Sequence, residues 1–364
     1  MRARLAGWRI SQLALTAWSG KSSVWRLAIA AAQYLLRWRP MSTATDEVPV
    51  TQTFGAAGED IPVLDLAGYL AGDEGALEKV AAELRYALEE VGFFVIVNHG
   101  ISQSLMDQMY AETERFHVLP ESAKSKLAIN RDNVGYMGNE GELPRTSPYY
   151  TGTLKPDVGE CFFIMCDRGP RSLKIQNQWP NDLPGFRETL VEYYDALEEL
   201  GRKILPIYAT ALDMPPDYFR DAFSENETLS VLRAAHMPPD ELEDDQFNVG
   251  PHTDSSFFTL LAAADVPGLE LLSQSGNWFP ASPSAGSIVV NSGDMLTRWT
   301  NGRFLSTPHR VRNLSGHDRY SIPLFFQPKP DQVIECLPTC TTPDNPPKEP
   351  PITTGDYYDW FMQQ

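Results

Sequence analysis

Apolar residues recur at three- and four-residue steps through the first part of the chain, the spacing of amphipathic helices. In residues 73–91 these steps join Leu77, Val80, Leu84 and Leu88, and Gly92 follows at the point where such a helix ends. The same spacing predicts helices over 102–117 and 120–127 and a long helix over 186–212, with short strands at 61–66 and 93–97. We expect the long helix to brace a sheet.

Beyond Leu229 the pattern changes to short apolar runs separated by turn residues, among them Gly268, Gly276 and Gly286. Short strands at this spacing predict an antiparallel barrel or jelly roll. The chain is therefore expected to be mixed α+β, with a mainly β core and flanking N-terminal helices. The strands expected in this part are 229–236, 257–263, 269–272, 287–291, 309–311 and 320–326.

These patterns divide the chain into four regions. They are a leader over 1–45, a helical and strand region over 46–225, the jelly-roll core over 226–330 and a C-terminal tail over 331–364. The tail is rich in proline and then in aromatic residues. We expect it to fold back on the core as a short helix.

The leader allows two interpretations. Residues 1–40 hold seven basic residues and no acid, which is typical of a mitochondrial transit peptide. Alternatively, the natural start is Met41 and residues 1–40 are translated upstream sequence. The looseness of targeting signals favours the second interpretation, which predicts a cytoplasmic protein, whereas a genuine transit peptide would predict a mitochondrial one. No apolar run approaches the length of a membrane span.

Charge narrows the choice of partners. Removing the seven basic charges of residues 1–40 from the formal net charge of −18 leaves −25 on residues 41–364. Such an acidic body repels nucleic acid and anionic membranes, so neither is an expected partner. An anionic ligand must instead be captured by local positive charge. Nothing in the sequence pattern sets an oligomeric state.

Three residues have the spacing of a metal site with open positions. His252 and Asp254 are two residues apart, so on a strand they point to the same face with Cα atoms roughly 7 Å apart. His309, on a later strand, would complete a set of two imidazoles and one carboxylate. That set suits Fe(II) and leaves coordination positions for a co-substrate and O2.

A second pair follows ten residues after His309. Arg319 and Ser321 share one face of a predicted strand. A guanidinium and a hydroxyl that point into one cavity hold a carboxylate through charge-assisted hydrogen bonds. Together with the metal ligands, this pair would bind a dicarboxylic keto acid by chelation at one end and anchoring at the other.

These motifs belong to a longer ordered set. The segments are residues 60–65, 92–100, 155–160, 251–254, 289–296 with 299–302, and 306–311, followed by Arg319 and Ser321. In this order, from about Ile61 to Pro328, the chain resembles the isopenicillin-N-synthase-like group of Fe(II)/2-oxoglutarate-dependent oxygenases. The resemblance implies a double-stranded β-helix with flanking helices.

The resemblance also implies an activity. Fe(II) would be held by His252, Asp254 and His309, and 2-oxoglutarate would chelate the iron while Arg319 and Ser321 hold its distal carboxylate. O2 and 2-oxoglutarate would then be consumed in the oxidation of a small organic molecule, by hydroxylation, desaturation or cyclisation.

One position departs from the family pattern. Many relatives carry a Tyr before the Pro on the strand ahead of the metal motif, and its hydroxyl helps to bind the distal carboxylate. Here Met237 stands in that place, before Pro238, and Met has no hydroxyl to donate. The alternatives are therefore a 2-oxoglutarate-independent Fe(II) oxidase of the same fold and, from another class, a jelly-roll binding module without turnover.

Three further residues are candidates for the substrate pocket. Arg233 would bind an anionic substrate if it points inward, although its charge favours an outward position paired with surface acids. Tyr136 lies in the polar, glycine-containing segment 128–150, which suits a substrate-facing lid. Asn291 borders a tight turn and is expected to be structural or to line the pocket.

Two histidines outside the motif carry weaker expectations. His117 is expected at a surface or turn position, and His236 in either the core or the pocket.

Overall fold

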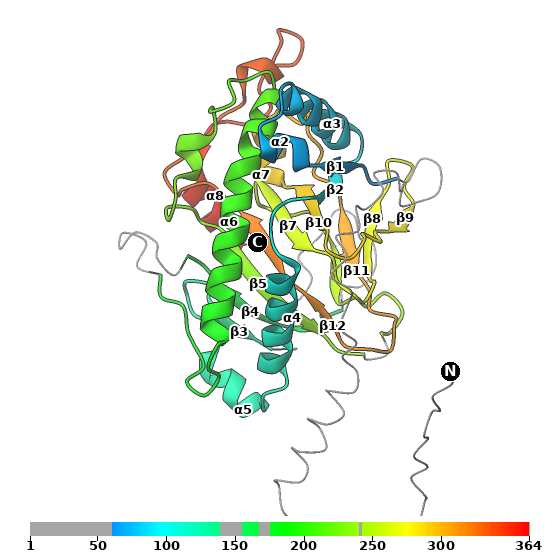
Figure 1. Ribbon diagram of the computed structural model, residues 1–364, viewed down its shortest axis with the longest axis vertical. Helices are drawn as coiled ribbons and strands as arrows, with labels where there is room; N and C mark the ends of the chain where they lie inside the picture. Colours follow the sequence, from blue (N-terminus) through cyan, green and yellow to red (C-terminus); the bar gives the residue numbers. More distant parts are fainter. Residues whose placement is uncertain (1–59, 139–154, 167–174, 240–241, 364) are drawn as a thin grey trace, which may run out of the picture. The chain divides into compact units, whose positions relative to one another are not determined.

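The computed structural model describes residues 60–138, 155–166, 175–239 and 242–363, which belong to one compact unit, Val50–Gln364 (Figure 1). The predictions for the leader over 1–45, and for residues 139–150 of the expected lid, lie outside the described residues. Within the described residues, no helix combines the length and apolarity that crossing a bilayer requires.

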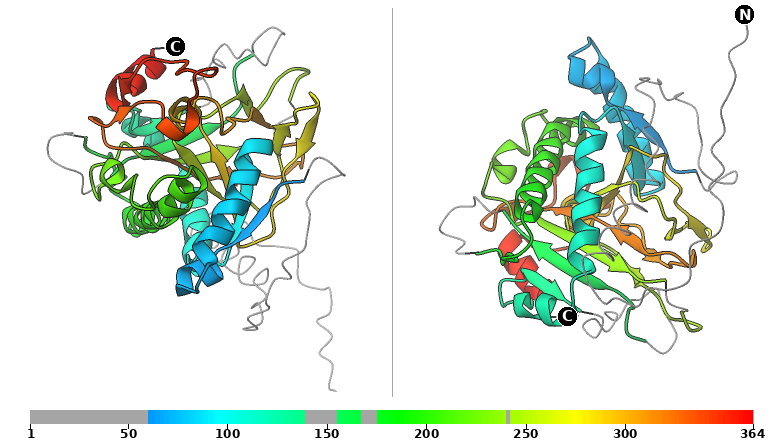
Figure 2. Two further views of the ribbon diagram at one scale, coloured as in Figure 1. Left: turned by 90° about the horizontal axis from the view of Figure 1, so that it is seen from above. Right: turned by 60° about the horizontal axis from the view of Figure 1, so that its bottom comes forward.

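Three helices cover one face of the larger sheet, α3 (Ala76–Glu90), α4 (Gln103–His117) and the long α6 (Phe186–Ala211) (Figures 1 and 2). Their apolar sides meet the sheet in the main hydrophobic core. Gly201 lets α6 approach closely, because a Cβ at this position would lie 2.8 Å from the ring of Phe326. The other helices are α2 (Ala67–Ala71), α5 (Glu121–Lys124), α7 (Asp294–Trp299) and α8 (Thr354–Met362).

The larger sheet joins strands from both halves of the chain in the order β1-β2-β10-β7-β13-β5-β4-β3, with β12 also paired to β5. β1 and β2 are parallel, and the other pairs are antiparallel. The strands are β1 (Val63–Asp65), β2 (Phe93–Val97), β3 (Gly135–Met137), β4 (Glu160–Ile164), β5 (Val231–Met237), β7 (Phe258–Ala262), β10 (Ile288–Ser292), β12 (Arg319–Ser321) and β13 (Pro323–Phe326).

The smaller sheet has the order β6-β11-β8-β9 and packs against the inner face of the larger one. Phe93 and Ala235 of the larger sheet share a core with Leu271 and Val311 of the smaller sheet. Alternate residues of the larger sheet therefore face this interior, and those between them face the helices. The remaining strands are β6 (Val249–His252), β8 (Leu269–Leu272), β9 (Trp278–Pro280), β11 (His309–Val311), β14 (Val333–Ile334) and β15 (Ile352–Thr353).

The predicted fold class is confirmed, with a double-sheet jelly roll and flanking N-terminal helices. The long helix, the strand at 93–97 and the helix in the tail are present. The run 320–326 was expected as one strand but forms two, β12 and β13, on either side of Ile322. The sequence pattern did not predict β6 or β9, because both are short and contain polar residues or proline.

Candidate active site

Two histidines and an aspartate meet inside the jelly roll. His252 ends β6 and lies opposite His309 of β11 in the register of the smaller sheet, with ring centroids 4.3 Å apart. Asp254 Oδ1 lies 3.5 Å from His252 Nε2 and 3.6 Å from His309 Nε2. We call His252, Asp254 and His309 the metal triad, since their ligand atoms all lie within 4.8 Å of one another.

Hydrogen bonds fix the orientation of both imidazoles. The Nδ1 of His252 donates to Gly250 O at 2.8 Å, and the Nδ1 of His309 donates to Thr307 O at 3.2 Å. In its neutral form each ring therefore presents an unprotonated Nε2 to the same carboxylate oxygen. Two lone pairs and one anionic oxygen that converge in this way fit a divalent cation, and backbone carbonyls on the far nitrogens are typical of metal-binding histidines.

The second oxygen of Asp254 is held away from this point. Its Oδ2 accepts hydrogen bonds from the Thr259 hydroxyl at 2.5 Å and from Asn291 Nδ2 at 2.7 Å. The backbone of residues 254–256 approaches Gly293 closely, because Gly293 has no side chain; a Cβ there would lie 2.1 Å from Ser256 O. Asn291, proposed from the sequence as a structural or pocket residue, thus contacts a member of the metal triad.

Electrostatics favour the protonation states of Asp254 and His309 that a metal requires. Burial raises the pKa of Asp254, but the imidazoles of His309 and His252 outweigh it and hold this pKa well below its usual range. Burial, together with the neighbouring His252, lowers the pKa of His309 to about 4. At neutral pH the triad therefore offers an ionised carboxylate and a neutral His309.

Arg319 and Ser321 both point into the interior of the jelly roll. In the register of the larger sheet, Arg319 pairs with Met237 and Ser321 with Ala235, whose side chains lie in the core between the sheets. Arg319 is only 3% exposed, and burial lowers its pKa to about 10.

The hydrogen bonds of Arg319 leave its charge without an anion. It donates to Val266 O and to the Met237 sulfur. Among the described residues, no carboxylate lies within ion-pair distance of this guanidinium. A buried charge in that situation is stabilised by an anionic ligand.

Arg233 also points inward, and the outward position favoured from the sequence is wrong. It alternates on β5 with Leu232 and Ala234, which face the helices, and its Nε donates to Cys161 Sγ at 2.9 Å. Moving a guanidinium away from water costs solvation free energy, which is why a surface position was expected. The Phe163 ring offsets part of this cost, because the guanidinium lies over it, 5.8 Å from its centroid.

Tyr136 lies on the helix-facing side of the larger sheet and not in the interior of the jelly roll. It was expected in a lid loop, but residues 135–137 form β3, and Tyr136 is buried in the helix-facing core. Its hydroxyl lies 2.9 Å from Glu121 Oε2 and 2.5 Å from Glu160 Oε2, so its one proton can be donated to either carboxylate. Because β3 pairs with β4, residues 135–137 belong to the sheet and not to a lid.

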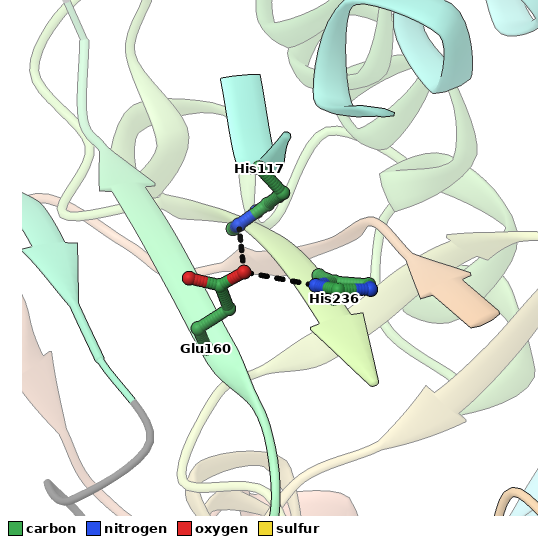
Figure 3. Close-up of side chains that lie close together, drawn as sticks. All are labelled: His117, Glu160 and His236. Carbon is green, nitrogen blue, oxygen red and sulfur yellow. Dashed lines mark hydrogen bonds and ion pairs between the residues drawn. The ribbon is translucent and has the colours of Figure 1, made fainter. Parts of the chain in front are cut away.

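A second set of the same residue types lies on the helix-facing side of the larger sheet, formed by His117, Glu160 and His236 (Figure 3). Glu160 Oε1 lies 2.9 Å from His236 Nδ1 and 3.3 Å from His117 Nδ1. We call these three residues the Glu160 cluster. The expectation that His117 is a surface residue is wrong, since the end of α4 buries it against β5.

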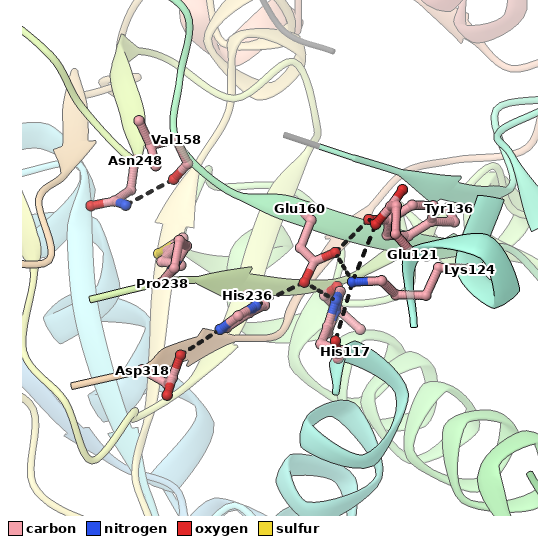
Figure 4. A network of polar contacts seen from close by, with 12 residues as sticks. His117, Glu121, Lys124, Tyr136, Val158, Glu160, His236, Pro238, Asn248 and Asp318 are labelled. Carbon is pink, nitrogen blue, oxygen red and sulfur yellow. Dashed lines mark hydrogen bonds and ion pairs between the residues drawn. The ribbon is translucent and has the colours of Figure 1, made fainter. Parts of the chain in front are cut away.

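A cation of the chain, Lys124, already lies beside the Glu160 cluster (Figure 4). The buried ammonium of Lys124 lies 2.5 Å from Glu160 Oε2. A metal ion bound here would add positive charge beside that ammonium, which Coulomb repulsion opposes. The cluster therefore fits an internal ion-pair network that joins α4 and α5 to the sheet.

Comparisons with known proteins point in one direction. Residues 228–328 match the family described as the 2OG-Fe(II) oxygenase superfamily, and residues 61–182 match the N-terminal region of a non-haem dioxygenase in morphine synthesis. The chain is 37% identical over 309 residues to the 2-oxoglutarate-Fe(II) type oxidoreductase hxnY of Emericella nidulans, covering 81% of this chain and 87% of that protein. It is also 37% identical over 316 residues to the kihadalactone A synthase LFS of Citrus sinensis, covering 82% and 92%.

Solved structures agree with these relatives. A 2OG-Fe(II) oxygenase family protein from Caulobacter crescentus superimposes with a TM-score of 0.73 at 30% identity, covering 83% of this chain and 98% of that one. JOX2 in complex with 2OG, Fe and JA superimposes with a TM-score of 0.70 at 28% identity, covering 91% and 93%.

Proposed function

The chain belongs to the 2OG-Fe(II) oxygenase superfamily, and from this premise we propose that His252, Asp254 and His309 hold its Fe(II) while Arg319 and Ser321 bind the distal carboxylate of 2-oxoglutarate. The protein is a 2-oxoglutarate-dependent oxygenase that acts on small molecules. When bound, Fe(II) with 2-oxoglutarate supplies the coupling of decarboxylation and O2 reduction to oxidation of the substrate.

The observation that carries the metal assignment is the convergence of two Nε2 atoms on one oxygen of Asp254. Hydrogen bonds with other residues of the chain orient each of the three metal-binding side chains. Gly250 O and Thr307 O hold the protons on the Nδ1 atoms, and Thr259 with Asn291 keeps Oδ2 occupied, so that Oδ1 would be left to bind the ion.

The co-substrate assignment depends on the buried charge of Arg319. Its strand neighbour Ser321 adds a hydroxyl on the same inner face. Met237 cannot replace the hydroxyl of the Tyr found in relatives, but its sulfur accepts from Arg319 and holds the guanidinium in the interior. We infer that Arg319 and Ser321 suffice, which disfavours the alternative of an oxidase independent of 2-oxoglutarate.

Metal and co-substrate binding can be tested together. Anaerobic addition of Fe(II) and then 2-oxoglutarate to the purified chain should give a visible charge-transfer band, and aeration should give succinate and CO2. We expect Asp254→Ala to lose the band and the succinate. Arg319→Met should keep Fe(II) binding but raise the KM for 2-oxoglutarate, whereas the exposed-residue control Arg220→Gln should change neither. Full Fe(II) occupancy and turnover in Asp254→Ala would refute the assignment.

We further propose that the protein has no nucleic-acid partner, because residues 41–364 carry a formal charge of −25. We also propose a cytoplasmic location, which the looseness of targeting signals favours over a mitochondrial one. Fluorescent fusions of the full chain and of a chain that starts at Met41 would test the location. Mitochondrial signal from the full chain alone would refute it.

A further inference from the structure

Two arginines lie on the inner face of the larger sheet, Arg233 on β5 and Arg319 on the neighbouring β12. Met237, next to Arg319 in the sheet, and Arg233 lie on the same face, four residues apart. At the rise of a β-strand this places their Cα atoms about 13 Å apart. The two guanidiniums therefore belong to different parts of the interior.

The two arginines also differ in accessibility. Arg319 is buried, whereas Arg233 is partly exposed. The members of the metal triad also differ in accessibility. The His252 side chain is 33% exposed, whereas that of Asp254 is 4% exposed. Arg233 is also near enough to His252 to act on it electrostatically.

Apolar side chains lie on one side of Arg233. Its guanidinium lies over Phe163, and Phe163, like Phe325 and Tyr358, packs against a small separate core that includes Val231. A ligand at Arg233 would thus meet a cation beside aromatic and aliphatic surface. A planar carboxylate is the anion that matches a guanidinium with two parallel hydrogen bonds.

We propose that Arg233 binds the carboxylate of the organic substrate, so that the enzyme oxidises small carboxylic acids with an apolar body. This inference rests on the proposed function, in which Arg319 and Ser321 hold 2-oxoglutarate. The proposal assigns the two arginines to two different acids, Arg319 to the co-substrate and Arg233 to the substrate. The acidic charge of the chain makes such a local cation necessary for capturing an anion.

The first test uses the unaltered enzyme. Full-length protein with Fe(II), 2-oxoglutarate and air is supplied with benzoate, phenylacetate or hexanoate, or with the primary amide of each acid, and succinate is measured. We expect at least one acid to raise succinate formation above its amide. If no acid raises it, or if amides act as well as acids, the proposal is overturned.

The second test uses variants and the most active acid of the panel. Arg233→Gln should raise the KM for the acid about 10- to 100-fold and abolish the preference for acid over amide, because a charge-assisted pair is lost. Arg233→Lys should lie between this variant and the wild type. Arg220→Gln, which removes the same charge at a side chain that is 73% exposed, should leave the KM unchanged.

A binding measurement separates this proposal from the function on which it rests. Calorimetric titration of the acid into anaerobic protein loaded with Mn(II) and 2-oxoglutarate should show the same loss of affinity in Arg233→Gln. Normal affinity in that variant would overturn the role of Arg233. Failure of the wild type to bind metal and 2-oxoglutarate, or to form any succinate, would instead refute the proposed function.

Discussion

Thr259→Val should weaken Fe(II) binding by about 10- to 100-fold while leaving the fold intact. Thr and Val have nearly the same shape, so the change removes little more than the hydroxyl that donates to Asp254 Oδ2 at 2.5 Å. Asn291 would remain as the other donor to that oxygen, at 2.7 Å. Asp254 would then be free to turn Oδ2 toward the metal or to lose its alignment with His252 and His309.

The magnitude follows from burial. The Asp254 side chain is 4% exposed, so water cannot readily replace the lost donor. A hydrogen bond to a charged group contributes about 1.5–3 kcal/mol. Because about 1.4 kcal/mol corresponds to a tenfold change in affinity, this loss corresponds to about 10- to 100-fold.

The assay is an anaerobic titration of the metal-free protein with Fe(II), or with Mn(II) followed by electron paramagnetic resonance. Thr259→Ser is the matched control, since it keeps the hydroxyl and should bind metal within about threefold of the wild type. Thermal unfolding of the metal-free variants checks that both are folded. Equal metal affinities for the Val and Ser variants would refute the idea that this hydroxyl positions Asp254.

Three other predictions concern the co-substrate and the Glu160 cluster. Arg319→Met should raise the KM for 2-oxoglutarate by about tenfold or more, and steady-state kinetics showing an unchanged KM would contradict the assignment. Glu160→Gln should lower the free energy of unfolding by about 3–5 kcal/mol, because it leaves the buried Lys124 ammonium with only the exposed Glu121 carboxylate, 3.6 Å away; urea denaturation measures this, and a loss below about 1 kcal/mol would contradict it. Burial lowers the pKa of His236, but Glu160 and Asp318 outweigh burial, so the pKa is raised. The stability that protonated His236 adds to the fold is therefore fully present below about pH 6.5 and is lost as the pH rises through the raised pKa. The difference in unfolding free energy between wild type and His236→Gln should therefore shrink above about pH 6.5, and a difference that does not change with pH would be inconsistent with this ion pair.

The sequence predicts residues well where a short-range rule applies. Strand alternation predicted a common direction for His252 and Asp254, and their ligand atoms do converge, although β6 ends at His252 and Asp254 lies two residues beyond it. The same rule places Arg319 and Ser321 together. The third ligand, His309, was assigned by spacing and resemblance, and the register of β6 with β11 brings it opposite His252.

Long-range contacts were not predictable in this way. Thr259 and Asn291 lie opposite each other on β7 and β10, and only that register brings both to Asp254. Alternation along β10 does identify Asn291 as inward-facing, because it shares a face with Val289. The role of His117 has no such signal, because it depends on how α4 packs across β5.

The metal triad and the Glu160 cluster show why donor atoms alone do not define a metal centre. Both contain two imidazoles and one carboxylate at similar separations. In the Glu160 cluster the carboxylate receives Lys124 and Tyr136 in addition to the histidines, so its negative charge is already balanced by groups of the chain. In the metal triad the donors to Asp254 are a hydroxyl and an amide, which orient the carboxylate without neutralising it. The uncompensated charge, rather than the residue types, makes His252, Asp254 and His309 the centre that attracts a divalent cation.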